Sequence, residues 1–142
     1  MMVMTAKEKE VINNQISSVE RYLNELLKYR SRARAAIEKN PEKLAALERY
    51  LYLAAQSAID LGDTIISYKK LRQPTSLAET FTILAEVGIL ERGLADKLVN
   101  MAKFRNVLAH NYVALDYDKV FYALRRGPDE IKGFLNAVSK LV

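Results

Sequence analysis

Apolar side chains recur every three to four positions along most of the chain, which is the spacing of one face of an α-helix. The first such stripe predicts a helix over about Thr5–Glu38. The second predicts a helix that begins at Asn40–Pro41, because asparagine caps helices and proline is favoured at their first position. Gln73–Pro74 is expected to end this second helix. The two stripes consist of Ile12, Ile16, Val19, Leu23 and Leu26, and of Leu44, Leu47, Leu51, Ala54, Ala58, Leu61 and Ile65.

The same periodicity continues in shorter segments after residue 75. Ser76 and Glu79 have the spacing of a capping box, in which each side chain accepts a hydrogen bond from the backbone N–H of the other residue. They predict the start of a third helix, which Gly88 is expected to end. A fourth helix is predicted from about Leu90 into residues 105–112. The apolar positions of these two helices are Phe81, Leu84 and Ala85, followed by Leu94, Leu98, Met101 and Leu108.

Two more helices are predicted near the end of the chain. Asp116 can cap a short fifth helix, and Gly127–Pro128 is expected to separate it from a last one. Their apolar positions are Val120, Phe121 and Leu124, then Ile131, Phe134, Leu135, Val138 and Leu141. No apolar–polar alternation bounded by turn residues indicates a strand. We therefore predict an all-α, up-and-down helical bundle with two long N-terminal helices, in which residues 1–142 form a single domain.

The composition narrows the classes of function. The chain has no cysteine, which excludes a disulfide framework, a thiol nucleophile and Cys-ligated zinc. Its 22 lysines and arginines exceed its 17 acidic residues, and the net charge of +5 suits an anionic partner such as RNA. Many basic proteins bind no anion, so the charge alone does not decide. Neither a signal peptide nor a membrane span is recognisable, and a cytoplasmic protein is expected.

The segment RNVLAHNY, residues 105–112, gathers the most reactive side chains of the chain. It contains Arg105, Asn106, Tyr112 and His110, which is the only histidine. His110 falls where the fourth helix is expected to end, and a side chain there can line a cleft. Each residue type also has a common structural role. A histidine is favoured at a helix C-terminus by the helix dipole, an arginine can pair with a surface carboxylate, and a tyrosine can pack in the core.

RNA cleavage by internal transesterification fits one imidazole and one guanidinium. The ribose 2′-hydroxyl is the nucleophile, histidine can move protons near neutral pH, and arginine can bind phosphate oxygens. A zinc site is disfavoured, and neither a glycine-rich phosphate loop nor a nucleophile elbow is present. We predict no metal or other cofactor. Because the reaction benefits from both an acid and a base, the single His110 indicates a two-fold homodimer with a shared cleft.

Other polar residues could support such a site. Asp60 and Asp63 share a strip of the second helix with Gln56 and Ser67, and one aspartate could pair with Arg105 or orient His110. A solvated helix face would account for the strip equally well. A basic patch for RNA is predicted in KYRSRAR, although a role in solubility is an alternative. The basic residues of this patch are Lys28, Arg30, Arg32 and Arg34.

The sequence resembles HEPN-domain toxins of the HepT type over roughly residues 5–140. The motif RNVLAHNY carries the resemblance, with FTILAEVGILERGLADKLVNMAKF before it, ALDYDKVFYAL after it and ALERYLYLAAQSAIDLGDTII in the second helix. The resemblance implies a dimeric, all-α, metal-independent endoribonuclease toxin. It also implies a partner, an MNT-type nucleotidyltransferase antitoxin. Arg105 and His110 would be the catalytic pair, Asn106 the polar residue beside them, and Tyr112 the acceptor of AMP from that antitoxin.

Two other functions remain open at this stage. The chain could be a non-catalytic helical nucleotide-binding module or partner subunit of a nucleotidyltransferase, in which the motif only clamps phosphate. It could also be a purely structural bundle, in which Arg105 and His110 would be replaceable without consequence. Cleavage of RNA without added metal separates these possibilities from a nuclease.

Overall fold

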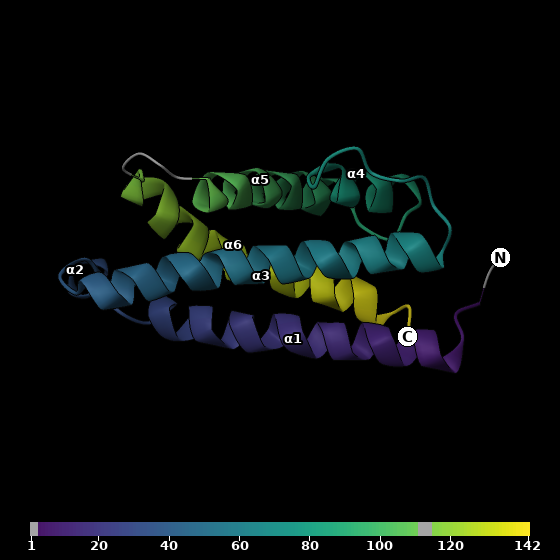
Figure 1. The fold of residues 1–142 in the computed structure, drawn as a ribbon, viewed down its shortest axis with the longest axis horizontal. Helices are drawn as coiled ribbons and strands as arrows, with labels where there is room; N and C mark the ends of the chain where they lie inside the picture. Colours follow the sequence, from purple (N-terminus) through teal and green to yellow (C-terminus); the bar gives the residue numbers. More distant parts are fainter. Residues whose placement is uncertain (1–2, 111–114) are drawn as a thin grey trace.

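The computed structural model describes residues 3–110 and 115–142, and within them it contains six α-helices and no strand (Figure 1). The prediction of an all-α fold is confirmed. The helices are α1 (Ala6–Arg30), α2 (Arg34–Glu38), α3 (Pro41–Tyr68), α4 (Glu79–Glu86), α5 (Arg92–Ala109) and α6 (Tyr117–Ser139). In these residues no helix is long and apolar enough to cross a membrane.

The four long helices alternate in direction and form the predicted up-and-down bundle. In Figure 1, α1 and α5 run from right to left, whereas α3 and α6 run from left to right. α3 packs against both α1 and α5, and α6 passes behind it to contact α1 and α5. Phe81 of α4 and Phe134 of α6 meet edge to face in the core, with ring centroids 5.3 Å apart. This packing places the C-terminal half of α5 beside α3.

The first predicted helix is divided into two, so this boundary prediction is wrong. α1 ends at Arg30, where the Ser31 hydroxyl donates to the Lys28 carbonyl at 2.7 Å. Ala33 is extended, and the short α2 then buries Ile37 completely. None of residues 30–36 is buried, so no packing holds the helix straight there. The predicted start is confirmed, because Thr5 and Glu8 form a capping box.

The second predicted helix begins as expected and ends earlier. Asn40 Oδ1 accepts hydrogen bonds from the backbone N–H groups of Glu42 and Lys43, both at 3.1 Å. α3 then ends at Tyr68, because Lys70 adopts a left-handed conformation with φ of 54°. Such helix ends usually contain glycine, and a lysine gives no warning of one in the sequence.

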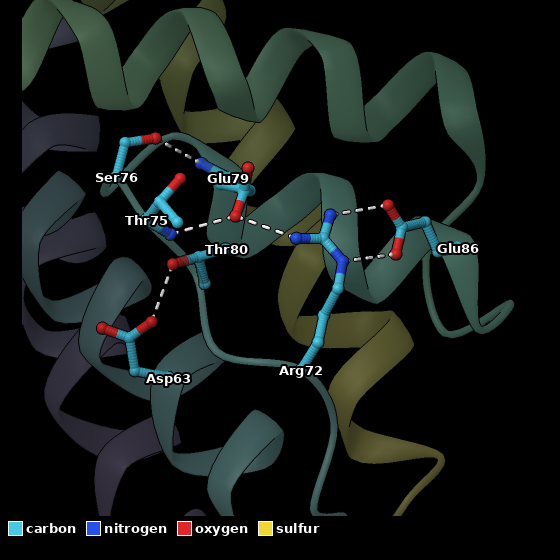
Figure 2. Close-up of polar contacts among 7 residues, drawn as sticks. All are labelled: Asp63, Arg72, Thr75, Ser76, Glu79, Thr80 and Glu86. Carbon is cyan, nitrogen blue, oxygen red and sulfur yellow. Dashed lines mark hydrogen bonds and ion pairs between the residues drawn. The ribbon is translucent and has the colours of Figure 1, made fainter.

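A cluster of side chains holds the connection from α3 to α4 (Figure 2). Arg72 donates to both oxygens of Glu86, at 2.7 and 3.0 Å, and to Glu79 at 2.9 Å. The backbone N–H of Thr75 and the Arg72 guanidinium lower the pKa of Glu79. The Ser76 hydroxyl accepts from the Glu79 N–H as predicted, but the Glu79 carboxylate accepts from Thr75 instead of closing the box on Ser76.

The last two predicted helices are one, so the predicted break at Gly127–Pro128 is wrong. α6 continues through Pro128, which is buried. An interior proline costs about 3 kcal/mol. A fully buried large apolar side chain contributes about 1.5–3 kcal/mol, so the apolar stripe on both sides of Pro128 outweighs this cost. The buried members of that stripe are Val120, Phe121, Leu124, Ile131, Phe134, Leu135 and Val138.

Candidate active site

Arg105 projects from the C-terminal half of α5 toward α3 and is partly buried there. Its Nε donates to Gln56 Oε1 at 2.6 Å, its Nη2 to the Tyr52 hydroxyl at 2.9 Å and its Nη1 to Asn106 Oδ1 at 3.1 Å. All three partners are neutral. The guanidinium is therefore held in place from three sides without losing its charge to a carboxylate.

Gln56 connects Arg105 to one of the two predicted aspartates. Its carbonyl oxygen accepts from Arg105, and its amide nitrogen donates to Asp60 Oδ1 at 2.8 Å. The two bonds require the same orientation of the amide, so they support one another. Asp60 is exposed and reaches Arg105 through Gln56 rather than directly.

Asp63 lies further along α3 and is bound to α4 instead. The Thr80 hydroxyl donates to Asp63 Oδ1 at 2.7 Å (Figure 2). Burial raises the pKa of Asp63, the hydrogen bond from Thr80 opposes that rise, and the charge of Asp60 adds to it. Thr80 is fully buried, so this contact joins α3 to α4. Of the two predicted aspartates, only Asp60 belongs to the hydrogen-bonded group around Arg105.

His110 is the first residue after α5. Its backbone N–H donates to the Asn106 carbonyl at 3.1 Å, and the residue is exposed. Arg105, Asn106 and His110 thus stand together at the C-terminal end of α5, where the sequence places the end of that helix. Tyr112 lies outside the described residues.

A hollow of about 320 Å³ adjoins this group at the end of α5. It is lined by Glu48, Arg49, Tyr52, Leu108 and Ala109. The sequence reasoning did not single out Tyr52 or Arg49. The sequence nevertheless contains a pattern that could have identified Tyr52. This residue lies four positions before Gln56, on the same strip of α3 as Gln56 and Asp60.

The predicted basic patch is divided by the break between α1 and α2. Three of its four members pair with carboxylates: Lys28 with Glu25, Arg30 with Asp129, and Arg34 with Glu38 and Asp118. Arg32 instead lies over the ring of Tyr29, 5.0 Å from its centroid. The contacts of these four residues thus differ from those of Arg105, whose side-chain hydrogen bonds to the described residues all go to neutral groups.

Comparison with known proteins places the sequence in a ribonuclease family. Residues 13–138 match the family model described as Ribonuclease HepT-like. The chain is 31% identical over 121 residues to the tRNA nuclease HepT of Aphanizomenon flos-aquae, covering 85% of this chain and 82% of that protein. It is 26% identical over 88 residues to the mRNA nuclease HepT of Shewanella oneidensis, covering 62% of this chain and 66% of the relative.

A solved structure shares the fold. The tri-AMPylated Shewanella oneidensis HEPN toxin, solved in complex with MNT antitoxin, superposes with a TM-score of 0.84. The two chains are 20% identical, and the match covers 96% of this chain and 99% of the toxin. At this level of identity the likeness concerns the fold, and the family assignment rests on the sequence matches.

Proposed function

The chain belongs to the HepT-like ribonuclease family, and we propose that it is an endoribonuclease toxin that cleaves RNA without a metal ion, through Arg105 and His110. One observation carries this proposal. The guanidinium of Arg105 is fixed by three neutral hydrogen-bond acceptors near the end of α5, and the exposed His110 follows five residues later as the first residue after that helix. A fixed cation can stabilise the charge that grows on the phosphate during transesterification, and a histidine can move one of the protons.

The proposed reaction needs no nucleophile from the protein. The 2′-oxygen of the ribose attacks phosphorus, the bond from phosphorus to the 5′-oxygen breaks, and a 2′,3′-cyclic phosphate and a 5′-hydroxyl result. One imidazole accepts the proton of the 2′-hydroxyl, and an imidazolium gives a proton to the departing 5′-oxygen. Arg105 binds the non-bridging oxygens, whose negative charge grows in the transition state.

The hydrogen bonds of Arg105 leave part of its guanidinium available for substrate. Of the five N–H groups of an arginine side chain, three are donated to Gln56, Tyr52 and Asn106. With respect to residues 3–110 and 115–142, one N–H therefore remains on each of Nη1 and Nη2. Two N–H groups are what a bidentate contact with a phosphate uses.

A homodimer would supply the second proton carrier. One protomer holds a single histidine, and the reaction uses both a base and an acid. In a two-fold dimer with facing motifs, one His110 acts as the base and the partner's His110 as the acid. Alternatively, one His110 serves both steps through water. The exposure of His110 at the end of α5 supports either arrangement.

An MNT-type nucleotidyltransferase is the proposed antitoxin, with Tyr112 as the residue it modifies with AMP. Two observations support this partner. The motif of this chain includes Tyr112 two residues after His110, and the toxin of the same fold from Shewanella oneidensis was solved in AMPylated form with an MNT antitoxin. An AMP group so close to His110 would add bulk and negative charge at the place where RNA phosphate must bind.

Cleavage in the presence of EDTA tests the proposed function. We expect the purified protein to cut end-labelled single-stranded RNA in excess EDTA and to leave 2′,3′-cyclic phosphate ends. A substrate of the same sequence that contains only 2′-deoxyribose is the control, and it should stay intact because it lacks the nucleophile. RNA that is bound but never cut would support the alternative function, a non-catalytic phosphate-binding partner of a nucleotidyltransferase.

Replacement of Gln56 by glutamate tests whether Arg105 needs a neutral partner. The new carboxylate can accept the same hydrogen bond from Arg105 Nε, but it can no longer donate to Asp60, and its charge competes with phosphate for the guanidinium. We expect kcat/KM for RNA to fall by roughly tenfold, which corresponds to about 1.4 kcal/mol. Ser67→Glu is the matched control, because it adds the same charge to an exposed position of α3 further from Arg105. Equal rates in both variants would show that the neutrality of Gln56 is irrelevant.

A further inference from the structure

Two guanidinium groups converge on the ring of Tyr52. The Cζ atom of Arg105 lies 4.8 Å from the ring centroid, and the Cζ atom of Arg49 lies 5.3 Å from it. The separation between the two Cζ atoms is therefore at most the sum of these two distances. Arg49 and Tyr52 are three residues apart on α3, so they occupy neighbouring positions of the same face.

Neither of these arginines forms an ion pair with any carboxylate in the described part of the chain. Among the described residues, Arg30, Arg34 and Arg72 are the arginines that pair with an aspartate or glutamate, and other arginines such as Arg21 and Arg32 also lack an ion pair. The carboxylate nearest in sequence to Arg49 is that of Glu48, and it accepts a hydrogen bond from the Tyr117 hydroxyl at 3.3 Å. Two like charges held near one another repel, and an anion bound between them would remove that cost.

The space beside Arg49 has the size of a polymer unit rather than of a single ion. The hollow that Arg49 and Tyr52 line measures about 320 Å³, at the lower end of the roughly 300–1,000 Å³ of small-ligand pockets. Glu48 also lines the hollow, and its carboxylate accepts a hydrogen bond from the Tyr117 hydroxyl. From the last turn of α5, Leu108 and Ala109 complete the wall immediately before His110. A strand bound at Arg105 and His110 would therefore continue past Arg49.

We propose that Arg49, Tyr52 and this hollow form a second phosphate subsite, which binds the phosphodiester next to the one that is cleaved. The ligand class is single-stranded RNA that extends at least one nucleotide beyond the scissile bond. Tyr52 positions the two guanidinium groups, and Arg49 contributes binding rather than chemistry. The subsite rests on the proposed function, because the neighbouring phosphate is defined relative to the one that Arg105 holds.

The test compares Arg49→Gln with Arg21→Gln on two substrates. Arg21 is an apt control, because its Cζ also lies 5.3 Å from a tyrosine ring centroid, that of Tyr22, on another helix. For an RNA pentamer, Arg49→Gln should raise KM by roughly tenfold and leave kcat nearly unchanged, while Arg21→Gln changes neither. The slope of log KM against log salt should also become shallower by about 0.7, the contribution of one phosphate contact in a single strand.

The second substrate is a dinucleoside monophosphate, which contains the scissile phosphate and no neighbour. With it, Arg49→Gln should behave as the unchanged protein does. An equal loss on both substrates would place Arg49 at the scissile phosphate and overturn the subsite. No loss on either substrate would overturn it as well.

Binding measured without turnover separates the subsite from the nuclease activity. In a His110→Ala background, fluorescence anisotropy of a labelled pentamer should show weaker binding after Arg49→Gln and not after Arg21→Gln. If the unchanged protein cuts no RNA while this difference persists, the proposed function fails and the phosphate site stands. If cleavage is normal and the difference is absent, the subsite fails and the proposed function stands.

Discussion

Replacing either Arg105 or His110 by alanine is expected to reduce RNA cleavage by about a thousandfold or more. General acid–base catalysis by one side chain contributes typically about 10²–10⁴-fold, and one group that stabilises transition-state charge contributes about 10²–10³-fold. The two residues lie five positions apart at the end of α5, and the proposed mechanism needs both of them, so each loss leaves the other without its complement. Initial rates on a fluorogenic RNA in EDTA measure both effects directly.

The fold should survive both substitutions. His110 is exposed and follows the helix, so its side chain supports no core packing. Loss of the Arg105 side chain leaves the Gln56 carbonyl and the Tyr52 hydroxyl to find water at a partly open surface, which costs little. Circular dichroism and thermal melting should match those of Lys103→Ala, an exposed residue of α5 that serves as the control. Full cleavage by either variant would refute the assigned catalytic roles.

The helices themselves could be predicted because each has a continuous apolar face. Three boundaries could not. The break after Arg30 depends on where packing stops, and the end of α3 depends on a left-handed lysine in place of the usual glycine. Pro128 was expected to break α6, but the burial on either side of it is known only from the folded bundle. At Pro128 tertiary burial overruled local propensity, whereas the helix ends at Arg30 where packing is absent.

Only part of the candidate site could be predicted from the sequence. The grouping of Arg105, Asn106 and His110 could be predicted, because all three fall within one short stretch of sequence at a helix end. The partners of Arg105 on α3 could not, since Tyr52 and Gln56 precede it by 53 and 49 positions and meet it only through the packing of α3 on α5. Asp60 and Asp63 share one strip of α3. Only the placement of Thr80 on α4 shows that Asp63 is bound elsewhere.

Tyr112→Phe is expected to produce a toxin that its antitoxin can no longer silence. Phenylalanine has no hydroxyl to accept AMP, and a hydroxyl two residues from His110 has no role in the proposed reaction, so cleavage itself should persist. The purified variant is incubated with the cognate MNT-type nucleotidyltransferase and ATP. Intact-mass spectrometry then follows AMP attachment while RNA cleavage is assayed in parallel.

The unchanged protein should gain AMP on Tyr112 under these conditions and lose at least about a hundredfold in cleavage, because attached phosphate repels the RNA backbone and AMP fills the approach to His110. Tyr122→Phe is the matched control, since Tyr122 is 56% exposed on α6, and this variant should be modified and silenced as the unchanged protein is. If Tyr112→Phe still acquires AMP and loses activity, the acceptor is another residue. If the unchanged protein is modified on Tyr112 yet cleaves at full rate, silencing works by binding rather than by modification.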